Sequence, residues 1–211
     1  MNYSNLAQIS EAIDAVFDLY KNYGEQDYIG EEVTQLQHAL QCGHLAHEEY
    51  PDNKEIILGA FLHDVGHMFG FHTKDLESTG VTPVFNNYIN VDVVVDHLGA
   101  HNHEQLGSQF LQKMGFTNLI CSIPLNHVNA KRYLVSIDEN YYNNLSEASK
   151  QTLVQQGGLM SSEDIEKFKN DPNKDLYIKM RHWDDAAKST TFKYKYNLEY
   201  FRELANQLLN P

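Results

Sequence analysis

The sequence contains few of the residues that mark a secreted, membrane-bound or nucleic-acid-binding protein. There are only two cysteines, Cys42 and Cys121, so we expect no disulfide scaffold and a reducing, cytoplasmic compartment. Sixteen basic residues stand against 29 acidic ones, and the net charge of −13 argues against nucleic acid or an anionic membrane as a partner. No apolar run approaches the length of a membrane span, and no secretory signal is visible at the start.

Linkers and repeats are missing as well. No long stretch of glycine, serine or proline interrupts the 211 residues, and hydrophobic residues make up 42% of the chain. We therefore expect a single domain over residues 1–211, with its core at roughly 32–190. We expect it to be a monomer or a weak homo-oligomer.

Apolar residues at helical spacing predict an all-α class with roughly seven helices and no confident strand. The expected helices cover residues 6–23, 32–49, 54–67, 103–114, 118–135, 174–189 and 194–209. The polar segment 24–31 is expected to be a lid loop, and 144–170 to contain a polar loop or short helix. Between 68 and 100 the periodicity weakens, so we expect a long irregular connection of the kind that often carries function.

An imidazole and a carboxylate stand side by side in an apolar run at His63-Asp64. Both are costly to bury unless they are paired or bound to a metal. In a continuous helix, His63 would share a stripe with Ile56, Ala60 and His67, and Asp64 would lie on the next stripe. The sequence therefore predicts that the pair converges on one ion.

Further nitrogen and oxygen donors fall on the apolar sides of separate predicted helices. A single buried histidine is more often structural than a ligand, so the argument depends on their concurrence. The candidate metal ligands are His38, His63, Asp64, His103, His127 and Asp184. Donors without thiolates suit iron, manganese, cobalt or zinc, and six donors are too many for one tetrahedral zinc. The set predicts two metals, with Asp64 positioned to bridge them.

The choice between Asp184 and Asp185 depends on the helix face. Asp184 falls on the same stripe as Met180, which is expected to point inward. Asp185 falls with Arg181 and Lys188 on a charged face. We therefore prefer Asp184 as a ligand.

The other histidines have plainer interpretations. We expect His67 to reach the substrate or the surroundings of the metal, because it lies one turn beyond His63. Five others are expected to be at the surface or around the site (His44, His47), solvated (His101), without a role at the site (His97) or facing outward (His182).

In this order, the donors resemble the HD-domain superfamily, whose signature is an upstream His, a His-Asp pair and a distant Asp. Most of its members look like phosphohydrolases with one or two divalent metals. The intermediate pair, His103 and His127, is similar to its dinuclear branch, which includes mixed-valent di-iron oxygenases. The resemblance is closer still to the family of 2-amino-1-hydroxyethylphosphonate dioxygenases (glycine-forming). The matching stretches are 28–31, 35–41, 60–67, 103–104, 127–134 and 181–188.

The resemblance implies a non-haem di-iron dioxygenase that uses two iron ions, Fe(II)/Fe(III), with O2 as co-substrate. The substrate would be a small organophosphonate, a 1-hydroxyalkylphosphonate whose C–P bond is cleaved. The first choice is 2-amino-1-hydroxyethylphosphonate, giving glycine and phosphate. The resemblance also implies that one iron binds His38, His63, Asp64 and Asp184, and that the other binds Asp64, His103 and His127.

The same resemblance implies a substrate-binding set of Tyr28, Glu31, His67, Lys131, Ser149 and Thr152, of which Tyr28, Glu31 and Lys131 are the catalytic candidates. The phosphonate oxygens would be held by His67, Lys131, Ser149 and Thr152. The substrate amino group would be received by Glu31. Tyr28 matches a tyrosine that occupies an iron site until substrate displaces its loop.

Plainer interpretations exist for these residues too. Lys131 could be a solvated lysine and Ser149 and Thr152 a helix cap, but Lys131 shares a helix face with His127, which favours a role at the site. Glu31 could equally be an acidic residue at a helix N-terminus.

Other functions stay open at this point. The substrate could be the trimethylammonio or hydroxymethyl analogue. A metal-dependent phosphohydrolase would need the same core ligands but not Tyr28 and Glu31, and a non-catalytic regulatory HD module would not need all six donors. The segment 68–100 is longer than expected for the family and could reshape the lid or pocket.

Overall fold

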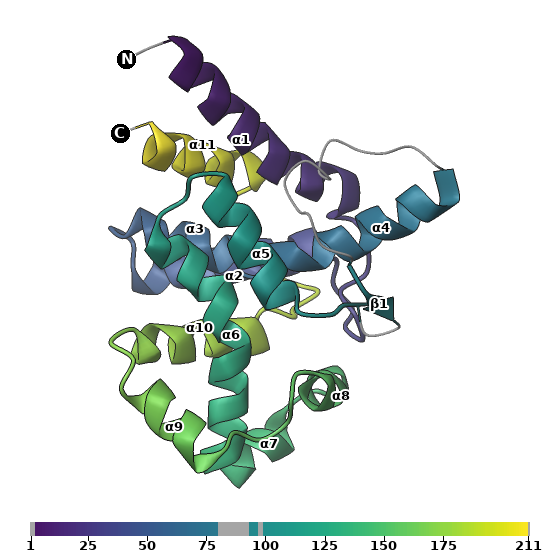
Figure 1. The fold of residues 1–211 in the computed structure, drawn as a ribbon, viewed down its shortest axis with the longest axis vertical. Coiled ribbons are helices and arrows are strands. Elements are labelled where there is room, and N and C mark those ends of the chain that lie inside the picture. Colours follow the sequence, from purple (N-terminus) through teal and green to yellow (C-terminus); the bar gives the residue numbers. More distant parts are fainter. Residues whose placement is uncertain (1–2, 80–92, 97–98, 211) are drawn as a thin grey trace.

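The computed structural model describes residues 3–79, 93–96 and 99–210. Within these ranges nearly all of the regular structure is helical, which agrees with the predicted all-α class (Figure 1). The helices are α1 Tyr3–Tyr23, α2 Gln35–Glu49, α3 Lys54–Leu62, the 3-10 helix η1 Val65–His67, α4 Met68–Thr79, α5 His103–Lys113, α6 Asn118–Ile137, α7 Glu139–Asn144, α8 Glu147–Gln155, α9 Ser162–Lys169, α10 Lys174–Ala186 and α11 Leu198–Leu209. In the described ranges, no helix combines the length and apolar character that a membrane span needs.

One feature was not expected from the sequence. Two short antiparallel strands, β1 Val95–Asp96 and β2 Gly99–Ala100, pair with each other shortly before α5 in the chain. No strand was predicted with confidence, and these two were not foreseen. A two-residue strand is too short to show the alternation by which strands are recognised in a sequence.

The predicted continuous helix over 54–67 is broken at the His-Asp pair. Helix α3 ends at Leu62, Asp64 leaves the helical conformation with φ −105° and ψ 12°, and a single 3-10 turn follows. The physical reason lies in tertiary packing, because Gly66 brings the backbone of this turn directly against that of His103 on α5. The pair therefore sits at a bend, where its side chains are not bound to one helical stripe.

The predicted irregular connection over 68–100 was also wrong in its first part. Helix α4 follows the 3-10 turn directly and buries Met68, Phe69 and His72. Residues 80–92 and 97–98, including His97, lie outside the described residues. Helix α4 was missed because its apolar residues are separated by glycine and polar residues.

Aromatic side chains hold the terminal helices against the centre of the fold. Helices α1 and α11 lie side by side near the two chain ends (Figure 1). The rings of Phe61 and Phe201 stack at a centroid distance of 4.3 Å. The ring of Phe17 also stacks on Phe61, at a centroid distance of 6.0 Å. Because Phe61 lies two residues before His63, this buried stack fixes the end of α3 that carries the pair.

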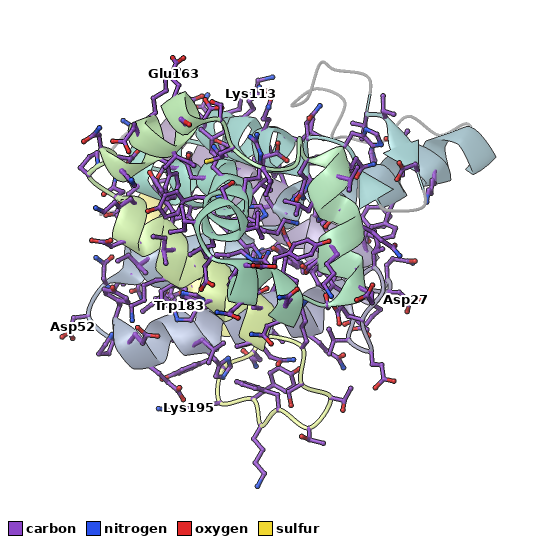
Figure 2. The ribbon with its side chains drawn as sticks, turned by 90° about the horizontal axis from the view of Figure 1, so that it is seen from below. Asp27, Asp52, Lys113, Glu163, Trp183 and Lys195 are labelled. Carbon is purple, nitrogen blue, oxygen red and sulfur yellow. The ribbon has the colours of Figure 1, made fainter. Side chains whose placement is uncertain are left out.

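Polar caps set the helix boundaries around the site. Thr34 forms a capping box with Gln37, so α2 begins at Gln35, three residues later than predicted. The N-cap Thr117 stands directly before α6, and the N-cap Ser146 stands directly before α8. Figure 2 shows charged side chains such as Glu163 and Lys195 around the outside, whereas Trp183 lies inward.

Replacing Gly66 by alanine is expected to destabilise the fold by about 3 kcal/mol, because the added methyl group would lie 1.9 Å from the His103 carbonyl oxygen. The same clash would displace His103. Thermal unfolding measures the loss. Gly70→Ala is the matched control, since its methyl group would lie 3.2 Å from the Ala100 side chain. Equal stability of both variants would contradict this interpretation of the α5 contact.

Candidate metal centre and substrate pocket

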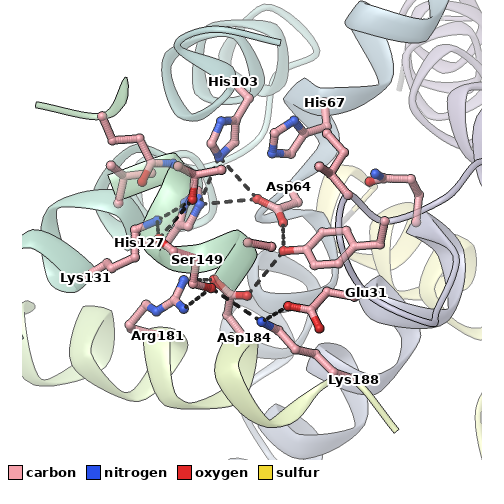
Figure 3. A pocket seen from close by; sticks show the side chains of 17 residues that line it. Glu31, Asp64, His67, His103, His127, Lys131, Ser149, Arg181, Asp184 and Lys188 are labelled. Atoms are coloured by element: carbon pink, nitrogen blue, oxygen red, sulfur yellow. Dashed lines mark hydrogen bonds and ion pairs between the residues drawn. The ribbon is translucent and has the colours of Figure 1, made fainter. Parts of the chain in front are cut away.

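Six candidate metal ligands from distant parts of the chain meet in the interior. Figure 3 shows four of them, Asp64, His103, His127 and Asp184, where they line a pocket. Each is at most 5% exposed. They come from α2 (His38), the bend after α3 (His63 and Asp64), the first turn of α5 (His103), the middle of α6 (His127) and the last turn of α10 (Asp184). The convergence that the sequence predicted is therefore present in the structure.

Four of these side chains form one group, which we call the first cluster: His38, His63, Asp64 and Asp184. Their ligand atoms all lie within 4.8 Å of one another. Asp64 Oδ2 lies 3.2 Å from His63 Nε2 and 3.6 Å from His38 Nε2, and Asp184 Oδ1 lies 3.5 Å from His38 Nε2. Two imidazoles and two carboxylates at this spacing can share one cation.

The other oxygen of Asp64 faces a second group, which we call the second cluster: Asp64, His103 and His127. Asp64 Oδ1 lies 3.2 Å from His127 Nε2 and 3.4 Å from His103 Nε2. The two Nε2 atoms are 3.1 Å apart. One carboxylate thus presents one oxygen to each cluster, which is the arrangement of a bridging ligand.

The histidine rings are oriented by the main chain. Nδ1 of His38 donates to the Ala187 carbonyl at 2.9 Å. Nδ1 of His63 donates to the Ala60 carbonyl at 2.8 Å, and that of His127 donates to the Pro124 carbonyl at 2.7 Å. In a neutral imidazole, a donating Nδ1 leaves a lone pair on Nε2, and it is Nε2 that points into the clusters.

These lone pairs provide a test of whether a metal fits. His38 Nε2 and His63 Nε2 are 3.4 Å apart, so when both rings are neutral and held by Nδ1 these two acceptors face each other. Burial opposes a charge on His63, but Asp64 and Asp184 raise its pKa, so a bound cation would take the place of a proton there. Asp64 Oδ1 is buried and has no hydrogen-bond partner. Acceptors that face one another without donors are satisfied by a cation, so the residues present fit a metal.

The protonation states suit metal binding. Burial lowers the pKa of His38 to about 4, so its ring is neutral at pH 7. Burial alone would raise the pKa of Asp64, but the His63, His103 and His127 rings around it hold that pKa well below the usual range. The pocket thus holds charged carboxylates beside a neutral imidazole, which is the form that ligates metals.

Arg181 distinguishes Asp184 from Asp185. The Arg181 guanidinium pairs with both carboxylates, but only Asp184 is fully buried and turned toward the first cluster. Asp185 lies at the edge, where it accepts a hydrogen bond from Tyr141 at 2.6 Å. Arg181 itself was predicted on a charged face, which was wrong, because it is 3% exposed. Its charge is compensated by the two aspartates on its own helix.

A cavity of about 50 Å³ adjoins both clusters and is lined by all six predicted substrate residues. Lys131 is 3% exposed, with Nζ 3.0 Å from Thr152 Oγ1 and 3.4 Å from the Ser149 carbonyl. It is therefore not a solvated surface lysine. Burial, assisted by the nearby Arg181 guanidinium, lowers the pKa of Lys131 to about 7. Lys131, Ser149 and Thr152 form a polar wall of this pocket.

Tyr28 closes the pocket over the first cluster. Its hydroxyl donates to Asp64 Oδ2 at 2.9 Å and lies 3.4 Å from Asp184 Oδ1. Its ring stacks on His38 at a centroid distance of 3.9 Å. Burial raises the pKa of Tyr28 well above its ordinary value, so the hydroxyl keeps its proton. Tyr28 therefore acts as a hydrogen-bonded cover of the first cluster.

Two more predicted residues line the same pocket. His67 stacks on His103 at a centroid distance of 3.8 Å, and its buried Nδ1 has no hydrogen-bond partner. Glu31 does not cap a helix, since Thr34 caps α2; instead its carboxylate lies 2.6 Å from Lys188 Nζ. Lys188 was predicted on a charged face, and the structure places it in the pocket wall, paired with Glu31. The spacing of four residues from Asp184 could have placed it on the Asp184 face.

His44 was expected at the surface or near the site, and the structure places it in the core. Nδ1 donates to the Leu40 carbonyl at 2.8 Å, while Nε2 accepts the backbone N–H groups of Lys195 and Tyr196 at 2.7 and 2.8 Å. His44 thus joins α2 to the segment before α11. This role depends on a partner about 150 residues away, which helical periodicity cannot show.

Three further histidines, His47, His101 and His182, lie outside the two clusters. His182 is exposed, as predicted. His47 is half-buried beside Tyr196. His101 was expected to be solvated, but it is only partly exposed and contacts Asp96 at 2.9 Å.

Comparison with known proteins assigns the family. No family model matches the chain. An uncharacterized protein of Acanthamoeba polyphaga mimivirus is 37% identical over 98% of this chain and 86% of its own length. A hydroxymethylphosphonate dioxygenase of Gimesia maris is 34% identical over 94% of this chain and 89% of its own length. A glycine-betaine-forming [1-hydroxy-2-(trimethylamino)ethyl]phosphonate dioxygenase of Leisingera caerulea is 35% identical, with coverages of 87% and 82%. The chain is therefore an oxygenase that belongs to the family of phosphonate dioxygenases.

Proposed function

We propose that the chain binds two irons and uses O2 to cleave the C–P bond of a 1-hydroxyalkylphosphonate. The observation that carries this proposal is the position of Asp64, whose two carboxylate oxygens face two separate groups of buried imidazoles. The order of His38, His63-Asp64 and Asp184 along a helical chain fits an HD domain. The relatives that are dioxygenases of phosphonates favour oxygenation over hydrolysis.

Each iron would have its own set of ligands. The first cluster would hold one iron through His38, His63, Asp64 and Asp184, and the second would hold the other through Asp64, His103 and His127. When bound, such a pair supplies Lewis acidity toward the α-hydroxyl and phosphonate oxygens, and redox chemistry with O2. The carbonyls of Ala60, Pro124 and Ala187 would keep three of the rings in the ligating tautomer.

The polar wall would bind the phosphonate group. Lys131 offers an ammonium, and the Ser149 and Thr152 hydroxyls can donate to the remaining oxygens. His67 lines the same cavity, and its buried Nδ1 has no hydrogen-bond partner. A dianion bound here would favour protonated Lys131, so substrate binding would draw a proton onto Nζ.

Two residues of the lid loop would organise the other end of the substrate. Tyr28 would exclude water from the first cluster while the pocket is empty, through its hydrogen bond to Asp64. Glu31 is the carboxylate available for a substrate amino group. We take 2-amino-1-hydroxyethylphosphonate as the first candidate, with glycine and phosphate as products. The hydroxymethyl and trimethylammonio compounds that name two relatives are the alternatives.

The test is a stoichiometric assay of the Fe(II)-loaded protein. With 2-amino-1-hydroxyethylphosphonate, we expect one O2 consumed for each phosphate and each glycine released. The atoms of substrate and O2 together equal those of glycine and phosphate, so labelled O2 should place one oxygen atom in each product when no water oxygen enters. The two alternative substrates are assayed in parallel. Phosphate release without O2 consumption would instead support a hydrolase.

A further inference from the structure

The pocket contains an ion pair that the proposed reaction does not itself require. Lys188 Nζ lies 2.6 Å from Glu31 Oε1, and only 16% and 14% of the two side chains are exposed. The residues are 157 positions apart, with Glu31 on the lid loop and Lys188 just beyond α10 (Figure 3). Burying this pair costs desolvation of both charges, so removing either partner would leave the other uncompensated.

Lys188 also faces the polar wall. Its Nζ lies 3.2 Å from Ser146 Oγ and 3.4 Å from Ser149 Oγ. Ser149 Oγ in turn lies 3.5 Å from the Arg181 guanidinium. The ammonium of Lys188 is thus placed between the Glu31 carboxylate and a hydroxyl that lines the phosphonate side of the cavity.

This placement changes what Glu31 presents to a ligand. An unpaired carboxylate would attract any cationic substituent on the substrate, but here an internal cation already neutralises it. A substrate ammonium must displace Lys188 from Glu31, whereas a substrate without a cation leaves the ion pair intact. The pair therefore adds a cost to one class of substrate and not to the other.

We propose that Lys188 is a specificity-determining residue of this pocket, acting as an internal cation that competes with a substrate ammonium for Glu31. The proposal rests on the proposed function, since it concerns the phosphonates that the site would accept. Lys188 released from Glu31 remains beside Ser149, where its charge can bind a phosphonate oxygen. The balance between these positions sets the preference between cationic and neutral substituents.

Two single substitutions distinguish this role from a structural one. Lys188→Met leaves Glu31 as an unpaired carboxylate, which attracts a substrate ammonium and repels a bare phosphonate. Glu31→Gln frees Lys188 for the phosphonate and removes the partner of the ammonium. The ratio of kcat/KM for 2-amino-1-hydroxyethylphosphonate to that for hydroxymethylphosphonate should rise about tenfold in the first variant and fall about tenfold in the second.

Both variants break the same ion pair, so a purely structural role predicts that both change the ratio in the same direction. The double variant, which has neither charge, should return the ratio toward the wild-type value. Lys150→Met is the matched control, because Lys150 pairs with Glu147 at 2.9 Å on the outside of α8. Its ratio should equal that of the wild type.

A binding measurement separates this proposal from the proposed function. Titration of the Fe(II)-loaded protein with each phosphonate in the absence of O2 gives a ratio of dissociation constants for every variant. Opposite shifts of that ratio support the role of Lys188, whether or not turnover is seen. An absence of turnover would overturn the proposed function but not the role of Lys188. Shifts in the same direction, or no shift in either variant, would overturn the role of Lys188.

Discussion

Replacing Asp64 by asparagine is expected to abolish oxygenase activity and to reduce the iron content from the proposed two per chain to less than one. Asp64 is the only residue shared by both clusters, so an amide there weakens two sites at once. Mutation of a residue that only hydrogen-bonds to a metal ligand typically lowers metal affinity about 10- to 100-fold. Loss of a carboxylate that is itself a ligand of both metals should lower the affinity more than about 100-fold. Iron is counted per chain after gel filtration, and activity is measured as O2 consumption.

Asp185→Asn is the matched control for this result. Asp185 lies beside Asp184 in the sequence but faces Tyr141 and Arg181 rather than the first cluster. This variant should keep two irons. Far-UV circular dichroism checks that both proteins are folded. Two irons retained by Asp64→Asn would contradict a bridging role for this carboxylate.

The convergence of the six donors could be predicted because most of them lie on long, regular helices. Helical spacing placed His38, His103 and His127 on buried faces, and the structure places them there. The same reasoning preferred Asp184 to Asp185, and Asp184 is the more deeply buried. Local periodicity is enough to predict the burial of such residues, because the apolar stripe of a helix identifies the face that packs against the core.

The bend at His63-Asp64 could not be predicted in this way. The apolar residues before it continue at helical spacing, and the break depends on the contact of Gly66 with α5, about 40 residues later. His44 was misplaced for the same reason, since its partners lie about 150 residues away. Charge and polarity in the sequence indicate a surface, unless a distant partner compensates them in the core.

Substitution of Lys131 by methionine is expected to weaken phosphonate binding about 100-fold while making the protein more stable below pH 7. The first effect follows because the ammonium is the main cation of the polar wall, and losing a buried charged partner costs about 3 kcal/mol. The second follows from the pKa of Lys131, which burial lowers from 10.5 to about 7. Binding is measured by calorimetry without O2, and stability by thermal unfolding.

The sign of the stability effect follows from proton binding. Between pH 7 and 10.5 the unfolded chain holds a proton on Lys131 that the folded chain has released, so wild-type stability from this group rises with pH across that window. Below pH 7 both states are protonated and the full cost of the buried charge remains. The gain in melting temperature from Lys131→Met should therefore be largest at pH 6 and should shrink toward pH 10.

Ligand binding should show the matching dependence. A bound phosphonate dianion favours protonated Lys131, so wild-type affinity should fall by up to about tenfold per pH unit above pH 7, and this slope should vanish in Lys131→Met. Lys167→Met is the control for both measurements, because Lys167 is exposed and pairs with Glu163 on α9, outside the pocket. A variant of Lys131 that lost affinity without gaining stability at pH 6 would show that the ammonium is compensated in the empty pocket. The carboxylates of Asp64 and Asp184 would then have to supply that compensation across the cavity.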